Sequence, residues 1–301
     1  MNPSTQKALV IINPHAARGR AHKRVAHVQA ALQSVDLPYD PVISEEPGHA
    51  IELARRGALA GRELIVAAGG DGTVHETVNG LMLAANEGAI STLGIIPIGS
   101  GNDFAAALGI SSDLDEAAQT LVHGQKRLLD VGCVNGRYFS SQTGVGFISV
   151  VSMEAGKKSI LTGQLLYLAA ILRTLGSYKL PTVNIEMDDG IIENKAILMI
   201  AVGNTHRMGG GFLITPEAQP DDGILDLVIV DAISTIQILR LLPKAMSGDH
   251  LGEPAVLMTR TTRLVVESEA PLILQADGET LWDDVHRMEV TVEPGRLPVL
   301  V

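Results

Sequence analysis

The chain has 301 residues, 46% of them hydrophobic and 3% aromatic, and its formal net charge at pH 7 is −11. This length allows one large or two ordinary domains, and the hydrophobic content supports a sizeable core and excludes a disordered chain. The acidic balance argues against bulk nucleic-acid binding and against strong electrostatic adsorption to anionic membranes, because both need a basic surface.

Cysteine use and the apolar segments bear on the compartment. Cys133 is the single cysteine, which excludes a disulfide framework and a cysteine-based metal site and fits a reducing, cytoplasmic compartment. The apolar run 8–12 is too short for the core of a signal peptide. Segment 160–175 contains Gln164 and Arg173 and is shorter than the ~20 residues that a transmembrane helix needs. We therefore expect no transmembrane segment.

Short apolar runs alternate with segments of helical periodicity in the first part of the chain. The runs that predict strands are 7–12, 40–44, 64–67 and 92–98. The segments that predict helices are 21–35, 48–60 and 73–85. This alternation predicts βαβ units and a parallel sheet. Ligands bind such sheets at the carboxyl ends of the strands, so the loops that follow the strands are the places to examine.

The turn Gly69-Gly70-Asp71-Gly72-Thr73 joins the third strand to its helix. Its glycines let backbone N–H groups approach an anion closely, and the helix N-terminus behind them adds about half a positive charge. A carboxylate such as Asp71 repels phosphate, but it fits this turn if a divalent cation lies between the two. The alternative is a tight turn whose glycines are only steric.

Three better-known motifs are absent from this turn. A Walker A loop needs a following Gly-Lys-Ser/Thr, and the dinucleotide fingerprint needs Gly-x-Gly-x-x-Gly. His75-Glu76 would begin a zinc-protease motif, but position 79 holds Asn79 in place of the second histidine.

A second Gly-rich loop, Gly99-Ser100-Gly101, follows the fourth strand. Asn102 and Asp103 can cap the short helix that comes next. The functional alternative is that they donate or accept hydrogen bonds with a nucleotide or a substrate hydroxyl. Two Gly-rich loops at consecutive strand ends favour phosphate chemistry more than either loop alone.

From residue 128 on, the pattern becomes that of an antiparallel β-domain with inserted helices. The segments that predict strands are 128–134, 137–142, 181–187, 191–202, 224–230, 263–267, 272–275 and 287–293. The segments that predict helices are 146–157 and 160–175. Asn135-Gly136 and Asp188-Asp189-Gly190 predict hairpin turns. We expect the two domains to pack against each other around a ligand cleft.

Two acidic stretches of this second half are candidate sites. Asp277-Gly278-Glu279 follows an apolar strand, and a carboxylate held there could accept a hydroxyl proton, which is typically worth about 10²–10⁴-fold in rate. Asp222 has the hard oxygen ligands that Mg²⁺ or Ca²⁺ prefers, and neighbouring backbone carbonyls could complete a site. For each stretch the alternative is an ordinary Asp-Gly turn.

The two Gly-rich loops and Asp277-Gly278-Glu279 together resemble the diacylglycerol kinase catalytic-domain family, which includes bacterial lipid kinases and the sphingosine and ceramide kinases. Asn13-Pro14 with the downstream Gly19 also resembles this family, and the motifs follow in the expected order along nearly the whole chain. The Gly-Gly-Asp-Gly turn alone is shared with NAD kinases and phosphofructokinases.

The resemblance implies an α/β N-terminal domain with a parallel sheet, of the NAD kinase and diacylglycerol kinase type, and a C-terminal β-sandwich-like domain. The expected nucleotide-binding domain is 1–127, with the chain end returning to it over roughly 289–301. The expected lipid-binding, β-rich domain is 128–288.

The resemblance also implies ATP and Mg²⁺ as cofactors and assigns site residues. The implied nucleotide contacts are Asn13, Ser44, Gly69, Gly70, Asp71, Gly72, Thr73, Val74, His75, Ser100, Gly101 and Asn102. Asp71 is expected to act on the phosphates through Mg²⁺, and either Asp277 or Glu279 to accept the proton of the lipid hydroxyl. A structural Mg²⁺ or Ca²⁺ of bacterial members maps onto the side chain of Asp222 and the backbone carbonyls of Gln219 and Ile224.

The chain departs from the family pattern at two of these positions. Position 75 is histidine where many members have asparagine, and position 44 is serine where threonine is frequent. Both side chains keep the capacity to hydrogen-bond, so we expect ATP binding to be retained.

We therefore expect phosphoryl transfer from ATP to the hydroxyl of a lipid such as diacylglycerol, by a cytoplasmic protein that works peripherally at the inner face of the membrane. Segment 160–175 is expected to form a wall of an acyl-chain pocket or a membrane-facing helix, with an ordinary core helix as the alternative. The rival functions are a kinase of a soluble acceptor such as NAD and a regulator that binds nucleotide or lipid without catalysis. The sequence does not choose among lipid acceptors or between a monomer and a homodimer.

Overall fold

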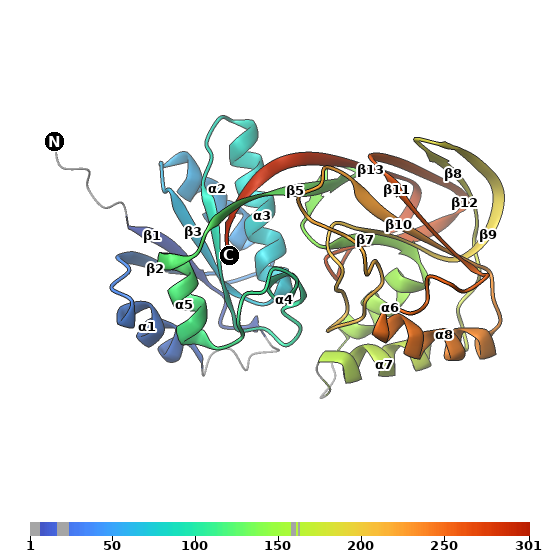
Figure 1. Ribbon diagram of the computed structural model, residues 1–301, viewed down its shortest axis with the longest axis horizontal. Coiled ribbons are helices and arrows are strands. Elements are labelled where there is room, and N and C mark those ends of the chain that lie inside the picture. The colour runs from blue at the N-terminus through green and yellow to red at the C-terminus, as the bar shows by residue number, and fades with distance from the viewer. Residues whose placement is uncertain (1–6, 17–23, 158–160, 162) are drawn as a thin grey trace. The chain divides into compact units, whose positions relative to one another are not determined.

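The computed structural model describes residues 7–16, 24–157, 161 and 163–301. The chain divides into two compact units, shown in Figure 1. Unit 1 extends to Leu129 and regains the chain end, Gly295–Val301, and unit 2 is Asp130–Pro294. None of the described helices combines the length and the apolar character needed to cross a bilayer.

Unit 1 contains the predicted parallel sheet, in the order β2-β1-β3-β4. Its strands are β1 (Ala8–Ile12), β2 (Tyr39–Ile43), β3 (Leu64–Gly69) and β4 (Thr92–Pro97). The end of β13 (Glu279–Leu300) adds a parallel neighbour to β4, with Val299 opposite Leu93. Strands β1, β3 and β4 are almost entirely buried, which is why their sequences are continuous apolar runs without polar alternation.

The helices of unit 1 are α1 (Val25–Ser34), α2 (His49–Leu59), α3 (Asp71–Asn86), α4 (Asp103–Ala107) and α5 (Leu114–His123). Helix α5 was not predicted, although Asp113 caps it by accepting the N–H groups of Asp115 and Glu116. Residues 21–23, where α1 was expected to start, and Gly19 lie outside the described residues.

Unit 2 is antiparallel, which confirms the predicted β-sandwich-like domain. Its strands follow the order β11-β10-β9-β7-β12-β13, and β8 pairs with both β9 and β12. The strands are β5 (Lys126–Val134), which begins in unit 1, and β6 (Arg137–Phe139), β7 (Gln142–Gly146), β8 (Thr182–Met187), β9 (Gly190–Gly203), β10 (Leu225–Asp231), β11 (Val256–Thr261) and β12 (Arg263–Ala276).

Two apolar cores stabilise unit 2. One lies among the strands and includes Phe139, Ile200 and Leu274. The other lies under three helices and includes Phe147 and Ala170. These helices are α6 (Phe147–Gly156), α7 (Gly163–Thr174) and α8 (Thr235–Ser247), and Figure 1 shows them on one side of the strands of unit 2.

Several predicted boundaries of unit 2 were wrong. The predicted strands 263–267 and 272–275 form one strand, β12. The predicted strand 137–142 is interrupted, because β6 ends at Phe139 and β7 begins at Gln142. Helix α8 and strand β11 were not predicted. Residues 158–160 and 162 lie outside the described residues, and 160 and 162 belong to the predicted helix 160–175.

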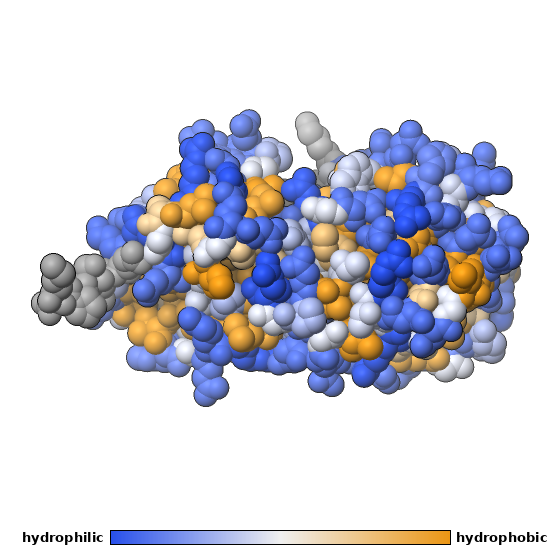
Figure 2. All heavy atoms as spheres, turned by 90° about the horizontal axis from the view of Figure 1, so that it is seen from above, coloured by the Kyte–Doolittle hydropathy of each residue, from blue (hydrophilic) through white to orange (hydrophobic). Residues whose placement is uncertain are grey.

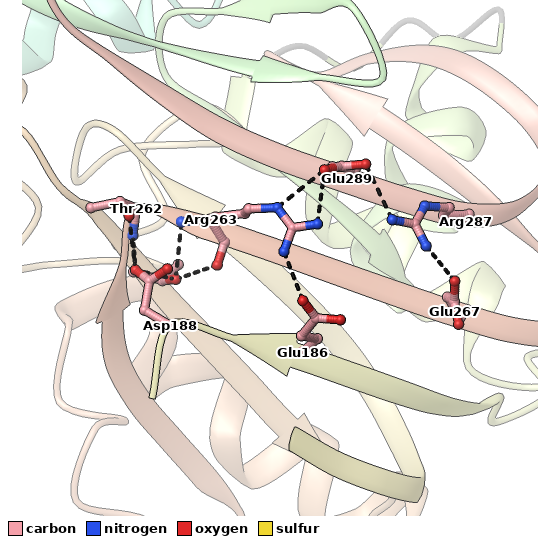
Figure 3. A network of polar contacts seen from close by, with 8 residues as sticks. Glu186, Asp188, Thr262, Arg263, Glu267, Arg287 and Glu289 are labelled. Carbon is pink, nitrogen blue, oxygen red and sulfur yellow. Dashed lines mark hydrogen bonds and ion pairs between the residues drawn. The ribbon is translucent and has the colours of Figure 1, made fainter. Parts of the chain in front are cut away.

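A ladder of charged side chains crosses β8, β12 and β13 on the surface of unit 2 (Figure 3). Arg263 contacts Glu186 of β8 at 2.7 Å and Glu289 of β13 at 3.0 Å, and Arg287 contacts both Glu267 and Glu289. Because these pairs are exposed, salt screens them and their role is to favour one strand register. We assign no ligand to this ladder.

Candidate functional site

The two Gly-rich loops of unit 1 touch each other at the carboxyl edge of the sheet. A Cβ atom at Gly99 would lie 2.4 Å from the Cα atom of Gly70, so a side chain there would force the loops apart. The N–H of Ile98 donates to the carbonyl of Gly69 at 2.9 Å. The loops after β3 and β4 therefore form one continuous backbone surface.

Asp71, the first residue of α3, links the two loops through its carboxylate. The N–H of Asn102 donates to Oδ2 of Asp71 at 2.7 Å, and the N–H of Phe104 donates to Oδ1 at 3.3 Å. The carboxylate thus satisfies amides at the start of α4 and lies against the positive end of that helix.

The prediction that Asn102 caps α4 with its own side chain was wrong. Asn102 has a left-handed backbone (φ 55°) and makes no side-chain cap hydrogen bond. Its Oδ1 atom accepts the N–H of Gly99 at 2.9 Å, which closes the Gly99–Asn102 loop on itself. Asp71, and not Asn102, is the side chain that accepts N–H groups at the start of α4.

The electrostatic surroundings of Asp71 are unusual for an aspartate. Burial, and to a smaller extent the charge of Asp103, raise the pKa of Asp71 to about 7, although backbone amides of residues 102–104 act in the opposite direction. Asp103 is itself buried. Two carboxyl groups that converge in a buried loop fit a divalent cation, because its charge would offset the cost of ionising both.

The other predicted nucleotide contacts lie along the same strand ends. Asn13, after β1, donates through Nδ2 to Oγ1 of Thr73 at 3.0 Å. Ser44, after β2, is buried, and its N–H donates to the carbonyl of Ile12 at 2.9 Å. The structure therefore brings together Asn13, the turn 69–73 and the loop 99–102 in unit 1.

Two further predicted nucleotide contacts, Val74 and His75, lie on α3. Val74 and His75 are almost fully buried, and Nε2 of His75 lies 3.4 Å from Nδ2 of Asn79. The carboxylate of Glu76 accepts the N–H groups of Gly48 at 2.7 Å and Ala50 at 3.1 Å. Glu76 therefore ties α3 to the start of α2, a structural role that the sequence analysis did not assign. Ser100, in contrast, is exposed.

In unit 2, Asp277 and Gly278 form a two-residue turn between β12 and β13. Both have left-handed backbones (φ 50° and 85°), and Ala276 pairs with Glu279 across the turn. This is the hairpin conformation that Asp-Gly favours. The alternative that this stretch is an Asp-Gly turn is therefore correct. Asp277 also has a second role, through its carboxylate.

The Asp277 carboxylate holds the interrupted strand beside it. The N–H groups of Ser140, Ser141 and Gln142 donate to it at 3.0, 2.8 and 3.1 Å. These bonds accompany the break between β6 and β7, because Ser140 and Ser141, which lie between the two strands, direct their amides toward Asp277. Asp277 is half-buried, whereas Glu279 is exposed.

A cavity of about 100 Å³ lies between α6, α7 and α8 and the strands of unit 2. Within the described part of the chain its lining contains no charged residue, and it includes Phe147, Val151, Tyr167, Ile171, Met199 and Leu241. The sequence analysis proposed 160–175 as a pocket wall, and Tyr167 and Ile171 of α7 do line the cavity.

Tyr167 connects this cavity to the acidic turn. Its side chain lines the cavity, and a Cβ atom at Gly278 would lie 3.1 Å from its hydroxyl oxygen. The apolar cavity therefore reaches Asp277-Gly278-Glu279 at a hydroxyl group. Sequence reasoning could not find this juxtaposition, because the two segments are more than a hundred residues apart.

The predicted metal residues Gln219, Asp222 and Ile224 lie in the loop before β10. Oδ1 of Asp222 accepts the N–H of Ile224 at 3.2 Å, and Oδ2 lies 4.0 Å from Arg260. Among the described residues, no group of three or more His, Cys, Asp or Glu side chains is arranged to hold a metal ion.

Asp226 gives this loop some capacity to bind a cation. Its carboxylate is buried and forms an ion pair with Arg260 at 3.5 Å, and neither oxygen has a hydrogen-bond partner in the described part of the chain. Burial, with the charges of Asp222 and Glu217, raises the pKa of Asp226. A cation bound by Asp222 would relieve this repulsion, so the surroundings fit one, and the structural metal site stays a prediction.

Comparisons with known proteins cover almost the whole chain. Residues 7–134 match the diacylglycerol kinase catalytic domain, and residues 141–301 match the YegS C-terminal NAD kinase beta sandwich-like domain. A diacylglycerol kinase of Bacillus subtilis (strain 168) is 33% identical over 276 residues, which are 91% of this chain and 90% of that protein.

Two solved structures are also similar. The crystal structure of a diacylglycerol kinase from Bacillus anthracis str. Sterne has a TM-score of 0.73 and 25% identity, and the match covers 98% of this chain and 96% of that chain. An NAD kinase from Archaeoglobus fulgidus, solved in complex with ATP, has a TM-score of 0.52 and 10% identity, and covers 98% of this chain and 93% of that chain. The second likeness concerns the fold alone.

Proposed function

The chain belongs to the diacylglycerol kinase family, and from that premise we propose that it transfers the γ-phosphoryl group of ATP to the hydroxyl of a diacylglycerol-like lipid. The observation that carries the proposal is the uncharged cavity of unit 2, which reaches the acidic turn at Tyr167. A substrate with acyl chains and one hydroxyl matches a site with an apolar interior and a carboxylate at its edge.

The loops of unit 1 would hold ATP. Their glycines leave backbone amides accessible, and the N-terminus of the 16-residue helix α3 adds partial positive charge beside them. Asp71 and Asp103 are the residues that would hold Mg²⁺ with the nucleotide. When bound, Mg²⁺ supplies charge neutralisation on the phosphates.

We assign the proton of the lipid hydroxyl to Glu279. The carboxylate of Asp277 already accepts three main-chain N–H groups, so we assign it the role of positioning the turn. In the transfer step the lipid oxygen forms a bond to the γ-phosphorus, the bond from that phosphorus to the β–γ bridging oxygen breaks, and the hydroxyl proton passes to Glu279.

The cavity favours a lipid over a soluble acceptor. NAD and sugar phosphates carry charges and many hydroxyls, and burying these groups without partners is costly. The lining offers them no charged side chain. A regulator without catalysis would not need a carboxylate beside the cavity, so the retained Glu279 favours an enzyme.

The test is transfer of label from γ-labelled ATP, with Mg²⁺, to dioctanoylglycerol, sphingosine and NAD offered separately. We expect label on dioctanoylglycerol, and its loss in Glu279→Gln. Asp283→Asn is the matched control, because it removes an exposed acid on the same strand. Label on NAD alone, or full activity of Glu279→Gln, would overturn the proposal.

A further inference from the structure

Ser152 of α6 places a hydroxyl group among the residues that line the cavity of unit 2. Ser152 is 3% exposed, and its Oγ atom has no hydrogen-bond partner among the residues that the structure describes. Burying a hydroxyl without a partner costs free energy, and most buried polar side chains in folded proteins have one. An unpaired hydroxyl beside a cavity therefore needs an explanation.

Other hydroxyl groups on α6 and α7 are paired within the protein. Ser149, three residues earlier on α6, is fully buried and donates to the carbonyl of Gly144 at 2.7 Å. Thr174 of α7 donates to the carbonyl of Ala170, one turn back, at 2.8 Å. Serine and threonine in a helix can generally do this. The missing partner of Ser152 is therefore a property of its position and not of its residue type.

Water is a poor partner for Ser152. A buried water needs about two to four polar groups, and an apolar cavity stays dry. Of the described lining residues, only Tyr167 carries another hydroxyl, and that oxygen would lie 3.1 Å from a Cβ atom at Gly278 in the acidic turn. The other side chains of the lining, such as Val151 and Leu241, are apolar. The partner of Ser152 is therefore expected to arrive with a ligand that is itself mainly apolar.

The surroundings of Ser152 differ from the outside of the protein. The face shown in Figure 2 is mainly hydrophilic, and its apolar residues form small separate groups, as is normal for a folded protein. Hydrocarbon chains would leave water more completely in the cavity than on that face. The ligand that meets Ser152 should thus combine hydrocarbon chains with a hydrogen-bond acceptor.

We infer that the hydroxyl of Ser152 donates a hydrogen bond to an ester carbonyl of the bound lipid, and so selects ester lipids over lipids of the same size that lack the carbonyl. The inference rests on the proposed function and deepens it, because it names the chemical class of the acceptor. In a diacylglycerol the ester carbonyls lie between the free hydroxyl and the hydrocarbon chains. One carbonyl oxygen accepts the proton of Ser152, and the chains contact the apolar lining.

The test compares dioctanoylglycerol with its diether analogue, in which methylene groups replace the two carbonyls. We expect the wild type to have a KM about three- to tenfold lower for the ester than for the ether, with similar kcat. The reason is that the hydrogen bond forms on binding and persists through the transfer step.

Ser152→Ala should abolish this preference. The KM for the ester should rise to the value for the ether, while the KM for the ether and both kcat values stay unchanged. Ser149→Ala is the matched control, because it removes a buried hydroxyl of the same helix whose partner lies within the protein. This control should keep the preference for the ester.

Unfolding in denaturant distinguishes the two variants a second time. Ser149→Ala should unfold at a lower denaturant concentration than the wild type, because it breaks the hydrogen bond to Gly144. Ser152→Ala should be at least as stable as the wild type, because it removes a buried hydroxyl that has no partner among the described residues. A loss of stability in Ser152→Ala equal to that in Ser149→Ala would overturn the inference, since it would reveal a partner within the protein.

Calorimetric binding of the two lipids to the full chain tests the inference without turnover. Tighter binding of the ester by the wild type, lost in Ser152→Ala, supports it. If that wild type phosphorylates neither lipid, the proposed function fails while the role of Ser152 in binding stands. Equal affinity of the wild type for ester and ether, or a preference that Ser152→Ala keeps, would overturn the role of Ser152.

Discussion

Asp71 in unit 1 and Asp277 in unit 2 use their carboxylates in the same way with different consequences. Each lies in a Gly-containing turn after a strand, and each accepts main-chain N–H groups of a loop distant in sequence. Asp71 also lies near Asp103 and has a pKa raised to about 7. One carboxylate is thus suited to take up a cation, and the other to hold a turn beside Glu279.

Replacing Asp71 should give the largest effect on activity. In Asp71→Ala the start of α4 loses its acceptor and the proposed Mg²⁺ site loses a ligand, so we expect turnover to fall by about 10²–10³-fold. Initial rates at saturating lipid measure this effect. Asp113→Ala is the control, because it removes another helix-capping aspartate of unit 1, and equal rates in both variants would contradict the assignment.

The raised pKa of Asp71 predicts a pH dependence of stability. Between its ordinary value of 3.8 and about 7, the folded chain binds more protons than the unfolded chain. The contribution of Asp71 to the free energy of unfolding therefore decreases as the pH rises through this window, by at most about 1.4 kcal/mol per pH unit. Above pH 7 it is constant.

Denaturant unfolding of the wild type and Asp71→Asn without divalent cations tests this dependence. The difference in stability between the two proteins should change across the window and then level off. A difference that does not vary with pH would show that Asp71 is ionised throughout.

Removing the Asp277 side chain should lower the free energy of unfolding, and by more than Asp71→Asn changes it at neutral pH. Asp277→Ala leaves the N–H groups of three buried residues without their acceptor, which we expect to cost about 2–3 kcal/mol. Chemical denaturation measures the loss. Asp283→Ala, on an exposed site of β13, should change stability by less than about 0.5 kcal/mol, and an equal loss in both would contradict the anchoring role.

Tyr167 should give the smallest effect. Tyr167→Phe keeps the cavity wall and removes the hydroxyl beside Gly278, so we expect KM for dioctanoylglycerol to rise a few-fold with little change in kcat. Steady-state kinetics in dispersed substrate measure both constants. A large fall in kcat with KM unchanged would place the hydroxyl in the chemical step instead.

The fold was largely predictable because its signals are local. Continuous apolar runs such as Ile65–Ala68 indicate strands buried on both sides, and the Gly-rich turns mark where they end. Helix α8 was missed because Pro243 within the segment argues against a helix. Two signals did favour one, since Ser234 and Gln237 form a capping box and the apolar residues lie mainly on one face.

The sequence indicated which residues belong to the candidate site, but it did not indicate what those residues contact. Local motifs indicated Asp71 and Asp277, but what these carboxylates bond depends on loops 31 and 137 residues away. The cap of α4 was therefore assigned to the nearer Asn102, which was wrong. The cavity is a property of packing between segments distant in sequence, so no single stretch could indicate it.

The central claim is that the two carboxylates of the unit 2 turn have different roles. The most direct measurement determines turnover on dioctanoylglycerol and unfolding free energy in parallel for Glu279→Gln and Asp277→Asn. We predict that Glu279→Gln unfolds like the wild type and loses about 10²–10⁴-fold in turnover, whereas Asp277→Asn loses stability and retains more activity. An active Glu279→Gln beside an inactive but stable Asp277→Asn would contradict the account.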